Sequence, residues 1–210
     1  MQPKARQIIS AATFAACLLF AAHPADAQAY ASLPRATSAA STEGEARPIP
    51  AWDAFCSENP LECSIDLGEP TEIPLTRQIW QKIVSVNNRV NATVRPLADD
   101  DHWGVPDRWN YPTDGFGDCE DYQLLKRRLL VEAGFPRRAL LMTVVIDEKG
   151  EGHAVLMVRT DRGDFVLDNK TQKVLPWDRT GYVFVKREGQ HGRGWTSFGE
   201  SSAPTTTANR

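Results

Sequence analysis

The chain has 210 residues, of which 41% are hydrophobic and 24% charged, and this is the composition of an ordinary globular protein. Its length predicts one domain with appendages at the ends. A formal net charge of −3, without a basic stripe, excludes nucleic acid as an expected partner.

The first 27 residues have the pattern of a secretory signal peptide. Lys4 and Arg6 form a basic start, residues 8–22 are apolar, and Ala25-Asp26-Ala27 supplies a small-x-small cleavage pattern. An uncleaved membrane anchor is the alternative, although the apolar run is short and alanine-rich for a membrane span. We therefore expect a periplasmic or secreted protein that spans no membrane once the signal peptide is removed.

Three cysteines remain beyond residues 1–27, namely Cys56, Cys63 and Cys119. The first two flank a short proline-containing loop, and such a pair is expected to form a disulfide in an oxidising compartment. One odd thiol, Cys119, is then left in an exported protein, where it is open to oxidation and mispairing. Its presence calls for an explanation.

The composition also predicts where the folded domain lies. Residues 28–50 are rich in Ala, Ser, Thr and Pro and have no apolar period, which predicts a flexible linker. Residues 196–210 are similar and predict a disordered tail. The folded domain is therefore expected over residues 51–195.

The first predicted helix covers about residues 76–94, where apolar residues recur at helical spacing until Pro96 ends the run. Asn87 and Asn91 share its apolar stripe, and we expect them to tie the helix to a neighbouring loop. Residues 98–117 have no period and are rich in aromatic residues and glycine. Ordered loops of this length are often functional, and its tryptophans also suit a loop pinned to the core.

A second helix is predicted over residues 119–133, since Gly134 suits a C-terminal cap and Pro136 blocks continuation. The remainder alternates between β-branched apolar runs and glycine-containing turns. The predicted strands cover residues 139–146, 153–159, 164–168 and 182–186. Helices followed by an antiparallel β-meander predict an α+β fold.

Cys119 opens the second predicted helix, between Gly117-Asp118 and Glu120-Asp121. A thiol at a helix N-terminus lies at the positive end of the helix dipole, which favours the thiolate. A buried structural cysteine is the alternative. The three flanking acids favour a surface or cleft instead.

The predicted strands place a base near a carboxylate. A two-residue loop at 161–162 and a four-residue loop at 160–163 give the same register, in which Val155 pairs with Asp168. His153 is then the diagonal neighbour of Asp168 on the same face, within reach of its side chain. A thiol, an imidazole and a carboxylate form the nucleophile, base and orienting group of acyl transfer. A strand-end histidine and a turn aspartate are the structural alternatives.

Three motifs carry a resemblance that is more specific than any one of them. They are Gly-Asp-Cys-Glu-Asp-Tyr at 117–122, Gly-His-Ala-Val-Leu at 152–156 and Gly-Asp-Phe-Val-Leu-Asp-Asn at 163–169, with Trp-Gly at 103–104 and Asp-Arg-Trp at 107–109 upstream. Over about residues 75–186 the chain resembles the bacterial transglutaminase-like cysteine proteinase family. The resemblance implies a papain/transglutaminase-like core with Cys119, His153 and Asp168 as catalytic residues.

The same resemblance implies a cofactor and partners. The LapG-type members of the family are periplasmic, calcium-dependent proteases that cut a large surface adhesin and release biofilm. By this resemblance Asp118, Glu120 and Asp121 would bind calcium, the adhesin would be the protein substrate, and an inner-membrane receptor would be the regulator. A cation would also offset the repulsion that carboxylates impose on a neighbouring thiolate. Acids that only complement the helix dipole are the alternative.

Three other functions stay open from the sequence. The same acyl-enzyme could pass its acyl group to an amine, as a transglutaminase does, instead of to water. A zinc hydrolase could use Cys119, His153 and Asp168 with His102, although no HExxH motif or close ligand pair supports zinc. A non-catalytic periplasmic binding module of the same fold is the third.

Overall fold

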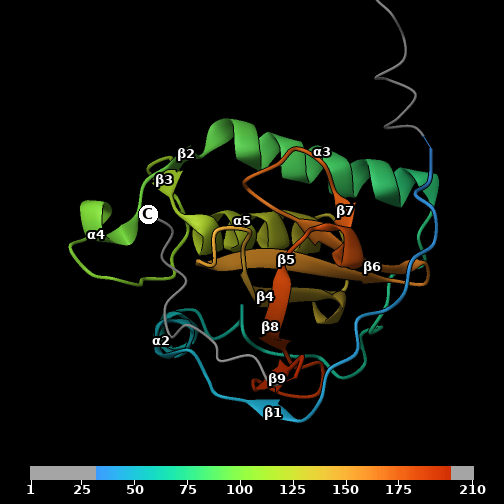
Figure 1. Ribbon diagram of the computed structural model, residues 1–210, viewed down its shortest axis with the longest axis horizontal. Helices are drawn as coiled ribbons and strands as arrows, with labels where there is room; N and C mark the ends of the chain where they lie inside the picture. The colour runs from blue at the N-terminus through green and yellow to red at the C-terminus, as the bar shows by residue number, and fades with distance from the viewer. Residues whose placement is uncertain (1–31, 200–210) are drawn as a thin grey trace, which may run out of the picture.

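The computed structural model describes residues 32–199 of the chain (Figure 1). The predicted signal peptide lies outside the described residues, and so does the end of the predicted tail, residues 200–210. Helices and an antiparallel sheet make up the fold, which confirms the predicted α+β class. Over the part of the chain that is described, no helix is both long enough and apolar enough to cross a bilayer.

The helices follow the predicted pattern closely in the middle of the chain. Thr76 caps the first long helix by accepting a hydrogen bond from the Ile79 amide, and Gly134 takes a positive φ of 87° just after the second, as its predicted role as a cap requires. The short helices α2 and α4 were not predicted. Over the described residues the α-helices are α2 (Pro50–Glu58), α3 (Arg77–Thr93), α4 (Asp99–His102) and α5 (Cys119–Glu132).

One seven-stranded sheet has the order β1-β9-β8-β4-β5-β6-β7. Strands β4, β5 and β6 lie side by side in chain order as predicted, but β8, the fourth predicted strand, pairs with the other side of β4, and β7, which was not predicted, lies beyond β6. The strands are β1 (Glu45–Ala46), β4 (Leu140–Ile146), β5 (Gly152–Thr160), β6 (Gly163–Leu167), β7 (Leu175–Pro176), β8 (Val183–Glu188) and β9 (Trp195–Ser197). Two further strands, β2 (Arg95–Pro96) and β3 (Phe116–Gly117), pair in parallel and close the base of the loop between α3 and α5.

Both faces of the sheet are buried, which explains the nearly continuous apolar runs of the central strands. On one face α5 packs on β5 and β4, and α3 packs on α5 (Figure 1). Leu156 and Leu167 belong to this core. On the opposite face a second apolar cluster includes Val155, Met157 and Val166.

Residues 37–49, here called the N-terminal strap, differ from the flexible linker expected for this part of the chain. The Thr37 amide donates to the Arg162 carbonyl at 2.8 Å, and the Ala40 amide donates to Asp164 Oδ2 at 2.9 Å. Thr37 lies so close to Gly163 that any side chain at residue 163 would collide with it, because a Cβ there would be 2.5 Å from Thr37 Cγ2. The strap is held mainly through backbone groups, which any sequence can supply, so its composition gave no signal.

The strap includes β1, which pairs with β9 at the edge of the sheet. Strand β9 extends two residues beyond the predicted domain end at residue 195, and Phe198 packs against the second apolar cluster.

The predicted disulfide is confirmed, since Cys56 and Cys63 are bonded. It links α2 to the following loop, and Trp52 and Phe55 of the same helix lie in the main core. Helix α2 has only nine residues, too few for its apolar spacing to stand out in the sequence.

A buried ionic cluster joins this loop to the far side of α5. Glu188 of β8 accepts hydrogen bonds from Arg127 at 2.9 Å and Arg137 at 2.7 Å, and from the Met142 amide at 2.9 Å. Arg137 also donates to the Glu62 carbonyl at 2.9 Å. Burial raises the pKa of the Glu188 carboxyl, but the two guanidinium groups and the amide outweigh it and lower that pKa overall.

Candidate active site

Cys119 is the first residue of α5 and is fully buried against β5, so the surface or cleft setting that its flanking acids favoured is wrong. Its Sγ donates to Glu120 Oε2 at 3.0 Å and accepts a hydrogen bond from the Ala154 amide at 3.3 Å. The thiol thus lies beside the residue that follows His153 in β5. Burial raises the pKa of the Cys119 thiol, and the carboxyl groups of Glu120 and Asp118 raise it further.

The register of β5 and β6 agrees with the sequence prediction. Thr160 pairs with Gly163 and Leu156 pairs with Leu167, so the two-residue turn is the one that forms. One step further along this register Val155 is opposite Asp168, and His153 is the diagonal neighbour. His153 Nε2 lies 2.9 Å from Asp168 Oδ1, and both side chains are buried.

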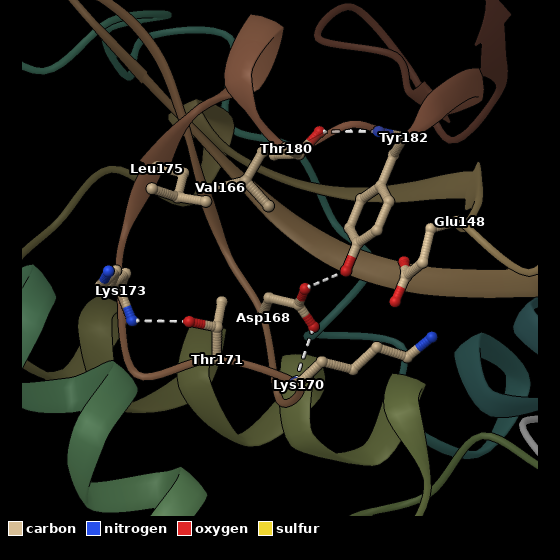
Figure 2. Close-up of a pocket in the computed structure, with 9 residues that line it drawn as sticks. All are labelled: Glu148, Val166, Asp168, Lys170, Thr171, Lys173, Leu175, Thr180 and Tyr182. Carbon is tan, nitrogen blue, oxygen red and sulfur yellow. Dashed lines mark hydrogen bonds between the residues drawn. The ribbon is translucent and has the colours of Figure 1, made fainter.

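Asp168 is held by more than the histidine. Its Oδ2 accepts a hydrogen bond from the Tyr182 hydroxyl at 2.6 Å, and its Oδ1 accepts another from the Lys170 amide at 2.9 Å (Figure 2). Burial raises the pKa of Asp168, but His153, the amide and the hydroxyl together lower it to about 2. An ionised carboxylate next to Nε2 favours the proton on that nitrogen, which leaves Nδ1 as the acceptor.

Tyr182 also contacts the His153–Asp168 pair, and the sequence did not reveal it. It precedes β8, and its ring lies edge-on to His153 with the centroids 5.7 Å apart. It therefore contacts both members of the pair.

Asn87 and Asn91 support the same loop from α3. The Asn91 amide donates to the carbonyls of Asp168 at 2.8 Å and Thr171 at 3.0 Å, and that of Asn87 donates to the carbonyls of Thr171 and Gln172. The expected link between this helix and a neighbouring loop is confirmed, and it fixes the backbone of Asp168.

Three buried carboxylates gather on the other side of Cys119. One oxygen from each of Asp99, Asp118 and Glu120 lies within 4.8 Å of the others. Strand β2 leads into α4, which carries Asp99, and β3 leads into α5. The parallel pairing of β2 with β3 therefore places Asp99 beside the start of α5. Asp99 and Asp118 are therefore neighbours although 19 positions separate them in the sequence.

These carboxylates have the properties expected of cation ligands. Asp99 Oδ1, both Asp118 oxygens and Glu120 Oε1 are buried and have no hydrogen-bond partner among the described residues. Asp118 precedes α5 but does not cap it with its side chain. Burial raises the pKa of Asp118 to about 7, and the nearby carboxyl of Asp99 contributes. Buried acids without donors are costly, and hard oxygen ligands of this kind suit calcium.

Asp121 lies outside this group. Its two oxygens accept hydrogen bonds from the Asn110 amide at 2.8 Å and the Asn110 side chain at 3.1 Å, and they anchor the long loop to α5. Gly117 makes room for it, because a Cβ there would lie 2.7 Å from Asp121. Burial raises the pKa of Asp121 to about 9.

Asp99 was not among the predicted ligands. Asp114, in the long loop, accepts hydrogen bonds from His102 at 2.8 Å and from the Phe116 amide. The run of acids at 99–101 was the available signal, but sequence alone does not show which of them turns inward. Among the described residues, the group of three close ligands includes neither Cys119 nor His102. This geometry does not support zinc.

The helices and the antiparallel sheet have the architecture expected of a transglutaminase-like fold. The sequence model of the bacterial transglutaminase-like cysteine proteinases (BTLCP) matches residues 42–203, and the chain belongs to this family. No curated protein is similar enough to count as a match.

Solved structures of one protein resemble this chain. LapG of Legionella pneumophila is 26% identical over 59% of this chain and 71% of its own, with a TM-score of 0.50. A calcium-bound structure of the same protein is 20% identical over 71% of this chain and 91% of its own, with a TM-score of 0.46. The membership and the first likeness make this chain a relative of the LapG-type cysteine proteinases.

Proposed function

We propose that this chain is an exported cysteine protease in which Cys119 is the nucleophile, His153 the general base and Asp168 the group that orients the histidine. The observation that carries the proposal is the buried His153–Asp168 pair. The residue after His153, Ala154, donates its amide hydrogen to the Cys119 thiol. Family membership supports the same chemistry.

In the proposed reaction His153 takes the proton from the Cys119 thiol, and the thiolate attacks the carbonyl carbon of a peptide bond. The C–N bond then breaks, His153 returns the proton to the leaving amine, and a thioester remains on Cys119. Water, deprotonated by His153, then attacks the thioester, the C–S bond breaks, and the acid is released while His153 returns the proton to the Cys119 sulfur. The Cys119 amide and a donor from residues 103–116 are the proposed oxyanion donors.

Calcium is the proposed cofactor, held by Asp99, Asp118 and Glu120. The unpartnered oxygens of these buried carboxylates support it. Bound there, the ion would neutralise much of the negative charge beside the thiol. Asp121 takes the supporting role of fixing the long loop that carries Asp99.

The proposal extends to the biological setting. By family resemblance, the substrate is a large surface adhesin, the regulator is an inner-membrane receptor, and the protease works in the periplasm after its signal peptide is removed. The disulfide between Cys56 and Cys63 supports an oxidising compartment.

The test is proteolysis by the purified chain from residue 28 onward, with cell-surface proteins as substrate and mass spectrometry to find new termini. Wild type should cut, and a folded Cys119→Ala variant should not. Equal cutting by both would refute the mechanism. A labelled amine in the same assay distinguishes transamidation, which would attach the label to substrate. A folded wild type that neither cuts nor labels would favour a binding module.

A further inference from the structure

A pocket of about 320 Å³ lies beside Asp168, between the end of β6 and the start of β8 (Figure 2). Side chains alternate along a strand, so His153 and Asp168 lie on the same sheet face as Val155 and Val166. Val166, Asp168 and Tyr182 all line the pocket. The pocket is therefore on the imidazole's side of the sheet and shares the Tyr182 wall with the His153–Asp168 pair.

The buried and half-buried polar groups around this pocket already have partners within the protein. Both oxygens of Asp168 accept hydrogen bonds, and the Lys170 ammonium is paired with the buried Asp147. The Thr171 hydroxyl accepts from the Lys173 amide, and the Thr180 hydroxyl donates to the Trp177 carbonyl. Little hydrogen-bonding capacity is left in the walls for a charged ligand.

What the pocket offers instead is apolar surface. Val166, Leu175 and the ring of Tyr182 form its apolar walls, while Glu148 and Lys173, which are exposed and opposite in charge, complete the lining. Its volume is at the lower end of the range for small-ligand sites, so it suits one side chain with its backbone better than a larger molecule.

We infer that this pocket is a specificity subsite that receives one aliphatic side chain of the polypeptide substrate. The inference rests on the proposed protease function. The carboxylate that borders the pocket is 2.9 Å from His153. A nucleophile–base contact of ~3 Å and the width of the imidazole add to this distance, so the pocket is on the order of 10 Å from the scissile carbonyl. This distance corresponds to about three residues of extended chain at ~3.3 Å each. The selected side chain is thus about three positions from the cleaved bond, on one side of it.

The experiment uses a library of long peptides from a partial proteome digest and reads the residues around every cleavage site by mass spectrometry. Wild type is compared with Leu175→Trp, which fills the pocket, and with Val183→Trp. Val183 is a matched control because it is a half-exposed aliphatic residue of the same sheet that does not line the pocket.

Wild type should enrich an aliphatic residue about three positions from the cleaved bond. Leu175→Trp should lower kcat/KM by about tenfold or more for peptides with leucine there and leave those with alanine almost unchanged. Val183→Trp should retain the wild-type preference.

Cleavage without aliphatic enrichment two to four positions from the bond would overturn the subsite, and so would a charged residue there or an unchanged preference in Leu175→Trp. In each of these cases the protease function would stand. Absence of any cleavage by wild type would instead remove the proposed function and the subsite together.

Discussion

The proposed calcium site gives the sharpest prediction, because removing one ligand should change stability in opposite directions with and without the ion. Asp99→Asn is the informative variant. Asp99 is buried and 20 positions before Cys119 in the sequence, so its effect does not arise from a change next to the nucleophile in the chain. Asp100→Asn is the matched control, since Asp100 follows it in α4 but is exposed.

The expected magnitude follows from linkage. A ligand at a hundred times its dissociation constant stabilises the folded state by about 2.7 kcal/mol. For a domain of this size each kcal/mol raises Tm by about 2–4 °C, so calcium should raise the wild-type Tm by roughly 5–11 °C. Asp99→Asn should lose most of this increase. In excess chelator it should be at least as stable as wild type, because it removes one of three crowded negative charges.

Thermal melts with calcium, magnesium or chelator measure these values, and proteolysis by the same samples shows whether activity follows. Calcium should act more strongly than magnesium, since an irregular loop suits its flexible coordination. The same Tm with calcium and with chelator would refute the site. An equal loss of the calcium effect in Asp100→Asn would refute the assignment of Asp99.

Three further predictions concern the catalytic pair and the core. His153→Gln should lower kcat by roughly 10²–10⁴-fold, whereas Asp168→Asn should leave more activity, and wild-type rates in both would end the assignment. Tyr182→Phe should lower kcat/KM about tenfold if its bond to the ionised Asp168 is worth ~1.5 kcal/mol. The ionised Asp168 stabilises the fold above about pH 4, and this stabilisation is lost as pH falls towards 2. In Tyr182→Phe the pKa of Asp168 rises, so thermal melts of this variant should show the loss of stability at higher pH. Glu188→Gln leaves buried guanidinium groups uncompensated and should cost about 3–5 kcal/mol, or a Tm drop of roughly 6–20 °C, whereas the exposed Glu132→Gln should change Tm little.

The sequence predicted the His153–Asp168 pair because local rules determine it. The turn between β5 and β6 has two residues, and Gly163 supplies the positive φ of 101°. Strand pairing then fixes which side chains share a face, and no tertiary information is needed. The same is true of α5, where apolar spacing, Gly134 and Pro136 gave both ends.

The parts that were not predicted depend on contacts between distant segments. Asp99 joins the acidic cluster only because β2 pairs with β3, and two-residue strands leave no periodic pattern. Tyr182 reaches Asp168 from a separate segment of the chain, so its role follows from packing. The N-terminal strap carries only a few apolar residues and is held by backbone bonds, so composition suggested a linker where the structure has an ordered segment.

The pairing of β1 with β9 sets the order in which the protein can assemble. Residues 45–46 are made long before their partners at 195–196. Strand β1 therefore has no partner until residues 195–196 have emerged, whereas the Cys56–Cys63 loop closes over seven positions and can form as soon as that segment is oxidised. An emerging chain would carry its local crosslink early and complete its sheet last. Until then the second apolar cluster, which Ala40 of the strap covers, remains accessible to chaperones and proteases.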